Sequence, residues 1–332
     1  MKTFQFRHAE TIDDAVSAGG AAGTRYLAGG TNLLDLMKGG VEEPSALIDL
    51  RRLGLTSIAS TDDGGVFIDA GVTNSAIANH PLIRTQYPVL SHAILSGATT
   101  QLRNMATAGG NLLQRTRCPY FMQTTFSSCN KRIPGSGCAA RTGFHREHAI
   151  FGASDSCVAI HPSDMAVALA ILDAVVHVQG SDGRRTVPIG DFFALPGDEP
   201  HIDNTLRHGE LILGIELPPS TFADHSWYLK VRDRHSYAFA LVSVAAGLRV
   251  DDGLITSAAL ALGGVAATPW RLHAAEQTLI GRPPDDRAFH AAANLAMDGA
   301  QPLPQNAFKV DLGRHSVVRA LTRAAAVRED RS

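Results

Sequence analysis

The sequence predicts an α+β fold with a larger N-terminal part and a smaller C-terminal part. Three observations support this class. Over residues 1–217, short runs with strand composition alternate with short helical patterns. Pro218-Pro219 interrupts this order, and three longer strand-like runs and then helical runs follow it. The length of 332 residues fits about two or three domains, and the break predicts two, at residues 1–219 and 220–332.

The composition is typical of a soluble globular protein and argues against two classes of function. The 30 Lys and Arg residues nearly balance the 32 Asp and Glu residues, whereas a nucleic-acid-binding protein needs a basic excess. The most apolar stretch, residues 165–178, is interrupted by Asp173 and His177 and is shorter than the ~18 residues of a membrane span. The first ten residues contain no apolar run, so we expect no signal peptide.

A helix is expected near the start of the N-terminal part. Thr11, followed three residues later by Asp14, is typical of a helix N-cap, and the helical pattern ends near Gly19. Strands are then predicted at residues 25–28, 46–50 and 66–71, and helices at residues 74–79 and 89–95.

The same alternation resumes after a long irregular segment. Ser163 and Asp164 can cap a helix that runs to Leu172. Asp182-Gly183 is typical of a hairpin turn. Strands are predicted at residues 174–178, 185–187 and 211–217, then three antiparallel strands at 227–232, 240–250 and 254–263, and helices at 270–279, 285–297 and 316–327.

Two glycine-rich turns are candidate phosphate-binding sites. Residues 25–28 lead into Gly29-Gly30-Thr31-Asn32-Leu33, and residues 105–108 lead into Gly109-Gly110-Asn111. A strand that runs through such a turn into a helix presents backbone N–H groups at the positive end of the helix dipole, which suits a phosphate or pyrophosphate. Paired glycines also occur in ordinary tight turns. Two such turns in one α+β region favour a dinucleotide as the ligand.

The four cysteines, Cys118, Cys129, Cys138 and Cys157, lie within 40 residues in the pattern C-x10-C-x8-C-x18-C. Four interpretations are possible. Disulfides are little needed in a chain that has no signal peptide and forms its own core. Structural zinc sites usually pair their ligands as C-x2–4-C, a spacing that this sequence lacks. The other two interpretations are unligated buried thiols and an iron–sulfur cluster held by four thiolates.

The surroundings of the cysteines favour an iron–sulfur cluster. Residues 114–157 show no sustained helical or strand period, and so long an irregular loop is uncommon in a compact domain unless something orders it. The binding energy of a metal cluster can close such a loop. Positive charge also lowers thiolate pKa values and raises the potential of a cluster. The basic residues of the segment, which equally suit a solvated surface, are Arg115, Arg117, Lys131, Arg132, Arg141 and Arg146.

In their order along the chain, the motifs resemble the FAD-binding (medium) subunit of the xanthine dehydrogenase and molybdenum hydroxylase family. The resemblance is carried by Leu27-Ala28-Gly29-Gly30-Thr31-Asn32-Leu33, Gln101-Leu102-Arg103-Asn104, Thr107-Ala108-Gly109-Gly110-Asn111, His161-Pro162-Ser163-Asp164 and Tyr228-Leu229-Lys230-Val231-Arg232. Most subunits of this family lack a cysteine-rich insert. Its presence makes the chain similar to the FAD and [4Fe-4S] subunits of bacterial periplasmic aldehyde oxidoreductases, with the 4-hydroxybenzoyl-CoA reductase subunit as the nearest alternative.

The resemblance implies a PCMH-type, or vanillyl-alcohol-oxidase-like, FAD-binding fold. Two α+β subdomains in residues 1–219 would hold FAD, with a [4Fe-4S]-binding insert at residues 114–157. Residues 220–332 would form a CO-dehydrogenase-flavoprotein-like C-terminal domain, a three-stranded antiparallel sheet with helices.

The resemblance also assigns residues to the two cofactors. The cofactor-binding positions would be Arg25, Tyr26, Leu27, Ala28, Gly29, Gly30, Thr31, Asn32, Leu33, Ala98, Thr107, Gly110, Asn111, Asp164, Leu213 and Lys230. The two turns would hold the pyrophosphate, and Asp164 would accept a hydrogen bond from a ribose or ribityl hydroxyl. Leu213 would pack on the cofactor, and Lys230 would approach the polar edge of the flavin. Cys118, Cys129, Cys138 and Cys157 would each bind one iron of a [4Fe-4S] cluster.

The implied function is that of an electron-transfer flavoprotein subunit in a heterotrimeric molybdenum-containing aldehyde oxidoreductase, which converts an aldehyde to a carboxylic acid. The aldehyde would react at a molybdenum cofactor in a large partner subunit. Electrons would then pass through [2Fe-2S] clusters of a small partner subunit to FAD and on to an external acceptor. We expect no catalytic residue for the aldehyde in this chain. Without a signal peptide, it would reach the periplasm only by co-export with a partner that carries one, and a cytoplasmic location is the alternative.

Three other functions remain open at this point. The chain could be the corresponding subunit of another molybdenum hydroxylase, such as a 4-hydroxybenzoyl-CoA reductase or a xanthine dehydrogenase. It could be a stand-alone flavin oxidase, which would need a substrate base and a pocket of its own. It could also be a zinc-stabilised scaffold, which would contain neither iron nor flavin.

Overall fold

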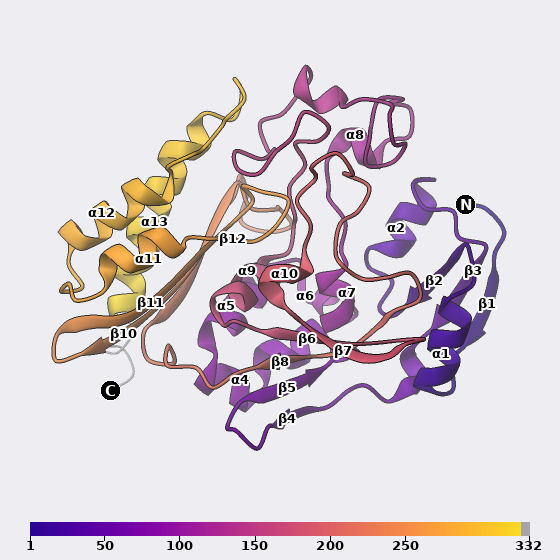
Figure 1. The fold of residues 1–332 in the computed structure, drawn as a ribbon, viewed down its shortest axis with the longest axis horizontal. Coiled ribbons are helices and arrows are strands. Elements are labelled where there is room, and N and C mark those ends of the chain that lie inside the picture. Colours follow the sequence, from indigo (N-terminus) through magenta and orange to yellow (C-terminus); the bar gives the residue numbers. More distant parts are fainter. Residues whose placement is uncertain (327–332) are drawn as a thin grey trace.

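The structure is a computed structural model that describes residues 1–326 and contains three β-sheets with helices packed against them (Figure 1). The N-terminal sheet and the C-terminal helices lie at opposite ends of the long axis (Figure 1). The largest sheet lies between them and takes its strands from two separate stretches of the chain. The predicted α+β class is therefore confirmed.

The N-terminal sheet is parallel, in the order β1-β3-β2. Its elements are β1 (Gln5–His8), α1 (Ile12–Gly19), β2 (Thr24–Leu27), α2 (Leu33–Lys38), β3 (Ala46–Asp49) and the 3-10 helix η1 (Arg51–Leu53). Helix α1 begins as predicted, because the side chain of Thr11 accepts a hydrogen bond from the backbone N–H of Asp14. The first glycine-rich turn connects β2 to α2, which confirms the predicted strand–turn–helix order.

The middle sheet is antiparallel, in the order β4-β5-β8-β6-β7. Its strands are β4 (Ile58–Ser60), β5 (Val66–Asp69), β6 (Val175–Gly180), β7 (Gly183–Pro188) and β8 (Leu211–Leu217). The helices that accompany it are α3 (Asn74–Asn79), α4 (Pro81–Gln86), α5 (Pro88–Ser96), α6 (Thr100–Arg103), α7 (Ala108–Leu112), α9 (Asp164–Ile171) and α10 (Ile189–Phe192). The predicted hairpin at Asp182-Gly183 joins β6 to β7.

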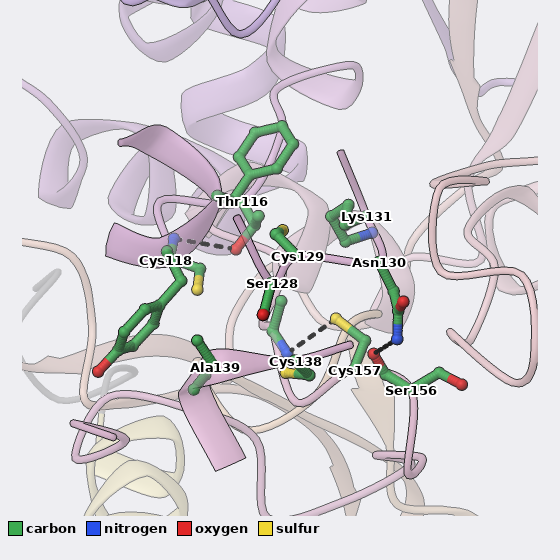
Figure 2. A pocket seen from close by; sticks show the side chains of 14 residues that line it. Thr116, Cys118, Ser128, Cys129, Asn130, Lys131, Cys138, Ala139, Ser156 and Cys157 are labelled. Atoms are coloured by element: carbon green, nitrogen blue, oxygen red, sulfur yellow. Dashed lines mark hydrogen bonds between the residues drawn. The ribbon is translucent and has the colours of Figure 1, made fainter. Parts of the chain in front are cut away.

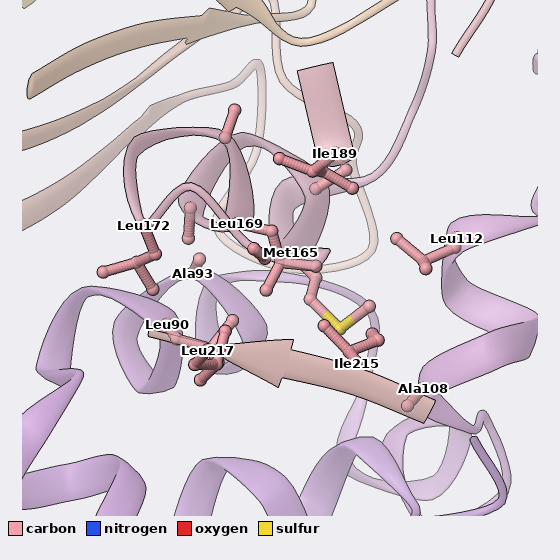
Figure 3. Packing of buried hydrophobic residues seen from close by; sticks show 14 of the residues in the cluster. Leu90, Ala93, Ala108, Leu112, Met165, Leu169, Leu172, Ile189, Ile215 and Leu217 are labelled. Carbon is pink, nitrogen blue, oxygen red and sulfur yellow. The ribbon is translucent and has the colours of Figure 1, made fainter. Parts of the chain in front are cut away.

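The main hydrophobic core lies around α9 (Figure 3). This helix is apolar on every side and is buried along its length. Met165 and Leu169 belong to one cluster with Leu90 of α5 and Leu217 of β8. Each such side chain contributes about 1.5–3 kcal/mol when it is buried. The packing fixes the loop before α9, where the predicted cofactor-binding residue Asp164 begins the helix.

The C-terminal sheet is antiparallel, in the order β12-β11-β10-β9. Its elements are β9 (Ser226–Val231), β10 (Val242–Asp251), β11 (Leu254–Gly263) and β12 (Trp270–Arg271), followed by α11 (His273–Leu279), α12 (Asp286–Ala296) and α13 (Phe308–Ala326). The three predicted strands are confirmed, and the sheet has the short β12 as a fourth. The domain boundary predicted at Pro218-Pro219 falls between β8 and β9 and remains a prediction.

The helix predicted at residues 270–279 is wrong at its start. Trp270 pairs with Leu262 as part of β12, and its ring stacks on Phe151 with the ring centroids 5.1 Å apart. This contact comes from a residue far away in the sequence, so local pattern could not reveal it. Helix α11 begins only at His273. The end predicted for the last helix, Val327, lies outside the described residues.

The segment between α7 and α9 is irregular, as expected. Within it the structure contains only α8 (Pro119–Met122), the 3-10 helix η2 (Ala139–Arg141) and an isolated bridge between Cys129 and Cys138. In the part of the chain that is described, no helix combines the length and the apolar composition that crossing a membrane requires.

Candidate functional site

The first glycine-rich turn lies directly against residues 105–106, which lead into the second. Gly29 has no space for a side chain, because a Cβ there would overlap the carbonyl oxygen of Met105. Gly30 has a φ of +73°, in the left-handed region that favours glycine. The glycines of the first turn are therefore required for its close approach to the second turn.

Asn32 connects the first turn to the segment that follows the second. Its Oδ1 accepts a hydrogen bond from the backbone N–H of Arg115 at 3.0 Å. Its Nδ2 is buried and has no hydrogen-bond partner among the described residues. Because an unsatisfied buried donor costs free energy, this position fits a ligand that supplies an acceptor oxygen.

The strand–turn–helix order predicted for the second glycine-rich turn is wrong, because Gly109, Gly110 and Asn111 lie within α7 (Ala108–Leu112) and the turn itself is at residues 104–105. This second turn and the start of α7 present several polar groups. Thr107 is the N-cap of α7, and its Oγ1 accepts a hydrogen bond from the backbone N–H of Gly110 at 3.3 Å. Asn111 follows in the same helix, and its Oδ1 accepts a hydrogen bond from Ser163 Oγ at 2.5 Å. Since Ser163 also caps α9, the second turn is connected to the loop before that helix.

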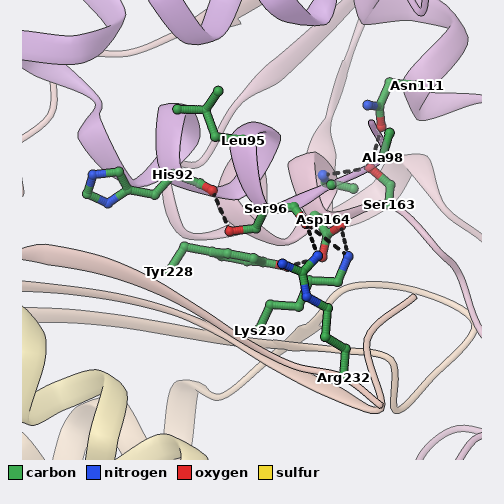
Figure 4. A network of polar contacts seen from close by, with 12 residues as sticks. His92, Leu95, Ser96, Ala98, Asn111, Ser163, Asp164, Tyr228, Lys230 and Arg232 are labelled. Atoms are coloured by element: carbon green, nitrogen blue, oxygen red, sulfur yellow. Dashed lines mark hydrogen bonds and ion pairs between the residues drawn. The ribbon is translucent and has the colours of Figure 1, made fainter. Parts of the chain in front are cut away.

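A buried polar network surrounds Asp164 (Figure 4). Asp164 accepts hydrogen bonds from Tyr228 Oη and Lys230 Nζ, both at 2.7 Å. The Lys230 side chain is 3% exposed and that of Asp164 is 9% exposed. Burial and then the neighbouring carboxylate raise the pKa of Tyr228 well above its ordinary value. Ala98, which has a φ of +51°, lies beside this network.

The remaining predicted positions differ in how much of the side chain is free for a ligand. Arg25 pairs with Glu42 at 3.2 Å and is half exposed. The Tyr26 hydroxyl lies 2.7 Å from the carbonyl oxygen of Gly209, and burial raises its pKa to about 12, so any ligand contact at Tyr26 would use its backbone. Leu213 is buried in a cluster with Ile48. The partly exposed residues of the first turn are Leu27, Ala28, Thr31 and Leu33.

These residues fit the pyrophosphate of a dinucleotide. The two turns are in contact, the glycines leave room for a close backbone approach, and the buried Asn32 Nδ2 still lacks an acceptor. The structure brings the two turns, Ala98 and Asp164 into one connected region. The individual ligand contacts of the predicted residues stay predictions.

The four cysteines line one cavity, although 38 residues separate the first from the last (Figure 2). All four are free, with Cys129 and Cys157 buried and Cys118 and Cys138 partly buried. The other lining residues are Thr116, Tyr120, Phe121, Ser128, Asn130, Lys131, Ala139, Ala140, Ser156 and Ala159. The irregular segment thus folds around a single space walled by thiols.

Local hydrogen bonds set the positions of the cysteines. Asn130 Oδ1 accepts a hydrogen bond from the backbone N–H of Gly137 at 2.7 Å, which closes the loop between Cys129 and Cys138. Cys118 is the N-cap residue of α8. Cys157 lies in a turn in which its backbone N–H donates to the carbonyl oxygen of Ser154 at 3.3 Å.

The chemistry of the four thiols allows them to bind iron. Within residues 1–326, no three His, Cys, Asp or Glu side chains are grouped as ligands of one metal ion. Four thiols spread around a cavity match a cluster in which each thiolate binds a different iron. Burial raises the pKa of Cys118 to about 12 and also raises that of Cys157, so metal binding must displace their protons.

The basic residues of the insert do not form a free basic surface. Lys131 Nζ lies 2.6 Å from Asp203 Oδ1, and Arg115 Nε lies 2.7 Å from Asp203 Oδ2. Burial alone would raise the pKa of Asp203, but these two cations outweigh it and lower the pKa. Arg146 pairs with Asp233 at 2.7 Å. The remaining partners are Asp35 for Arg117, Asp155 for Arg141, and backbone carbonyls for Arg132.

Sequence reasoning missed two residues of this region. Asp203 anchors the insert from a loop before β8, and His148 places its Nε2 3.2 Å from Cys118 Sγ. Burial lowers the pKa of His148 to about 4, so its imidazole is neutral near pH 7. Neither residue belongs to a local motif, because each contacts its partner across a long stretch of sequence.

Comparison with known protein families divides the chain into two matches. Residues 2–220 match the FAD binding domain in molybdopterin dehydrogenase. Residues 227–324 match the CO dehydrogenase flavoprotein C-terminal domain.

Similar proteins extend over nearly the whole chain. The aldehyde oxidoreductase FAD-binding subunit PaoB of Escherichia coli K12 is 48% identical over 98% of this chain and 99% of its own length. The glyceraldehyde dehydrogenase medium chain of Sulfolobus acidocaldarius is 26% identical over 97% of this chain and 96% of its own length. A chain of the CO dehydrogenase from Oligotropha carboxidovorans has the same fold, with a TM-score of 0.77 and 23% identity over 98% of both chains.

Proposed function

This chain belongs to the FAD-binding subunits of the molybdenum hydroxylase family and is an oxidoreductase subunit of the aldehyde oxidoreductase type. We propose that it is the electron-transfer subunit of a multi-subunit aldehyde oxidoreductase complex. The proposed reaction of the complex is the oxidation of an aldehyde to a carboxylic acid. When bound, FAD would accept electrons from a [2Fe-2S] subunit and deliver them to an external acceptor. The observation that carries the proposal is the close contact of the first glycine-rich turn with the residues that lead into the second. Beside this contact, the buried Asn32 Nδ2 has no hydrogen-bond partner among the described residues.

The two turns would hold the FAD pyrophosphate through backbone N–H groups. Gly29 and Gly30 allow the chain to approach the phosphate oxygens closely. Thr107 shapes the second turn by capping α7, and Asn32 donates from the first turn. The ammonium group of Lys230 balances the negative charge of the Asp164 carboxylate, so this carboxylate is not an unpaired buried charge. Asp164 would then accept a hydrogen bond from a ribose or ribityl hydroxyl of FAD.

A second cofactor is proposed for the cysteine-lined cavity. Cys118, Cys129, Cys138 and Cys157 would each ligate one iron of a [4Fe-4S] cluster. This assignment is supported by their common cavity and by their free thiols. Bound there, the cluster would supply a one-electron centre and close the irregular insert.

The partners in this proposal are a molybdenum-cofactor large subunit and a [2Fe-2S] small subunit. Similar proteins bear names such as FAD-binding subunit and medium chain, which describe one part of a larger enzyme. The aldehyde would react in the large subunit, so this chain would contribute no group to that step.

The proposal is tested by the cofactor content of the full chain, purified anaerobically without partners so that no partner iron is counted. We expect about one FAD and about four iron and four sulfide per chain. A chain that contains FAD but no iron would support the flavoprotein role and refute the proposed cluster. Adding the partner subunits should then make flavin reduction depend on aldehyde, whereas reduction by an aldehyde without partners would indicate a stand-alone oxidase.

The four-cysteine assignment is tested by Cys138→Ser. Because the hydroxyl is a much poorer iron ligand than a thiolate, we expect this variant to lose most of its iron and to retain FAD. Ser128→Ala serves as the control, because Ser128 lines the same cavity but is not a proposed ligand. Full iron content in Cys138→Ser would refute the assignment.

A further inference from the structure

Cys118 differs from the other three cysteines in its hydrogen bonding. In the described part of the chain, its sulfur alone among the cysteines meets a donor on another side chain, His148 Nε2 at 3.2 Å. Backbone N–H groups of Tyr120 and Phe121, at the start of α8, also face this sulfur. Within residues 1–326, the sulfur of Cys157 accepts from one backbone N–H, that of Ala159, at 3.4 Å. Donors are thus concentrated on one of the four thiols.

His148 is held in place independently of Cys118. Its side chain is buried, and its backbone N–H donates to the carbonyl oxygen of His145 at 3.1 Å. Its own carbonyl oxygen accepts hydrogen bonds from Asn306 and from Lys309, at 3.1 and 3.0 Å. Contacts from the insert and from the C-terminal part therefore fix the backbone that carries the imidazole.

The imidazole can serve as a donor to a metal-bound sulfur. A thiolate that ligates iron has no proton and can only accept hydrogen bonds. The opposite ring nitrogen, His148 Nδ1, is buried and has no partner in residues 1–326, so the only acceptor that the ring meets is Cys118 Sγ. The neutral imidazole is therefore assigned as the tautomer with its proton on Nε2. An imidazolium also has a proton at this nitrogen.

On the basis of the cluster proposed above, we infer that His148 is a positioning residue for it: the Nε2–H donates to Cys118 Sγ, holds that ligand toward the cavity and raises the reduction potential of the cluster. A hydrogen bond to a ligating sulfur withdraws negative charge from it and so favours the reduced, more negative cluster. Because His148 supplies the only side-chain donor to these sulfurs in the described chain, it is the place where substitution can change the potential without removing a ligand.

The test is a redox titration of the cluster, followed by its paramagnetic resonance signal in the anaerobic full chain. His148→Phe keeps a flat ring but removes the donor, so we expect a shift to more negative potential with the iron retained. His148→Gln restores an N–H at the position of Nε2 and should return the potential to near the parent value. His145→Gln is the matched control, because His145 is buried in the same insert and, in the described residues, its side chain contacts Ala140 and Gln305 but none of the cysteines.

The outcomes separate this inference from the proposed cluster itself. A parent chain without iron would refute the cluster, and the inference with it. With iron present in the parent, an unchanged potential in His148→Phe would overturn the role of the donor alone. If His148→Phe loses iron, the result for His148→Gln becomes decisive. Iron retained at the parent potential in His148→Gln supports the inference. Loss of iron or a shifted potential in His148→Gln overturns it. A shift of equal size in His145→Gln would also overturn it.

Discussion

At Gly29 the chain passes so close to the second turn that the position excludes every side chain. A Cβ there would overlap the Met105 carbonyl oxygen, and backbone cannot move aside as a flexible side chain does. We expect Gly29→Ala to separate the turns at a cost of about 1–3 kcal/mol, and hence to weaken FAD binding by roughly fivefold or more. Flavin absorbance after dialysis measures the loss.

Gly190→Ala is the control for that prediction. A Cβ at Gly190 meets no atom within 4 Å, and its φ is not in the left-handed region. We expect this variant to bind FAD like the parent. Equal flavin content in the two variants would show that the contact between the turns does not support the site.

Lys309 is fully buried and donates to the carbonyl oxygens of His148 and Gly264, at 3.0 and 2.8 Å. Burial lowers its pKa from 10.5 to about 7, with Glu147 opposing and Arg146 reinforcing that change. Between these values the unfolded chain binds a proton that the folded chain does not. The contribution of Lys309 to the free energy of unfolding therefore rises with pH between about 7 and 10.5, and is lowest below pH 7.

This pH dependence is measured as the difference between the parent and Lys309→Met. Groups common to both proteins, including the cysteines, cancel in the difference. We expect the difference to rise with pH by up to about 1.4 kcal/mol per unit in this window. A difference that does not change with pH would mean that Lys309 keeps its ordinary pKa.

Residues of the site differ in how well the sequence reveals them. The glycine-rich turns and the four cysteines are recognisable because their chemistry depends on residue type and local spacing. His148 and Asp203 could not be predicted, since their partners Cys118 and Lys131 lie 30 and 72 residues away. Such pairs depend on how the irregular insert folds.

At the scale of elements, Asp203 attaches the insert to the loop before β8. Lys131 is 6% exposed, so the loss of its carboxylate partner leaves an uncompensated buried charge. We expect Asp203→Asn to lower the free energy of unfolding by about 3 kcal/mol and to speed the loss of iron to a chelator. Hydrogen exchange should rise in residues 114–157.

Arg146→Ala is the matched control in the same insert. Arg146 and Asp233 are about half exposed, and pairs of this kind contribute roughly 0–1 kcal/mol. If both variants lost stability equally, burial of the Lys131 pair would not be the reason for its effect.

The predicted elements succeeded where a local signal existed. Thr11 and Ser163 cap α1 and α9 as expected, because their side chains accept hydrogen bonds from nearby backbone N–H groups. Short elements such as β4 (Ile58–Ser60) and β12 (Trp270–Arg271) were missed. They are strands because of their pairing partners, which a local pattern does not contain.

At the scale of the whole molecule, the N-terminal and C-terminal parts share a core. Tyr228, Ala245 and Ala261 of the C-terminal sheet belong to the cluster that surrounds α9. The buried ion pair between Asp164 and Lys230 joins the same two parts. The parts on either side of Pro218-Pro219 therefore share some of their packing, although the C-terminal part also has a hydrophobic cluster of its own.

This shared core predicts that both parts unfold in a single transition. The only two tryptophans, Trp227 and Trp270, lie in the C-terminal part, so their fluorescence reports on the C-terminal sheet and on its contacts with Phe151 and His92. Far-UV circular dichroism reports on helices and strands throughout the chain. We expect the two signals to give the same midpoint in urea, because neither part can lose its packing without exposing the core of the other. Separate midpoints, with the fluorescence change first, would show that the C-terminal sheet unfolds independently and that its contacts with α9 contribute little to stability.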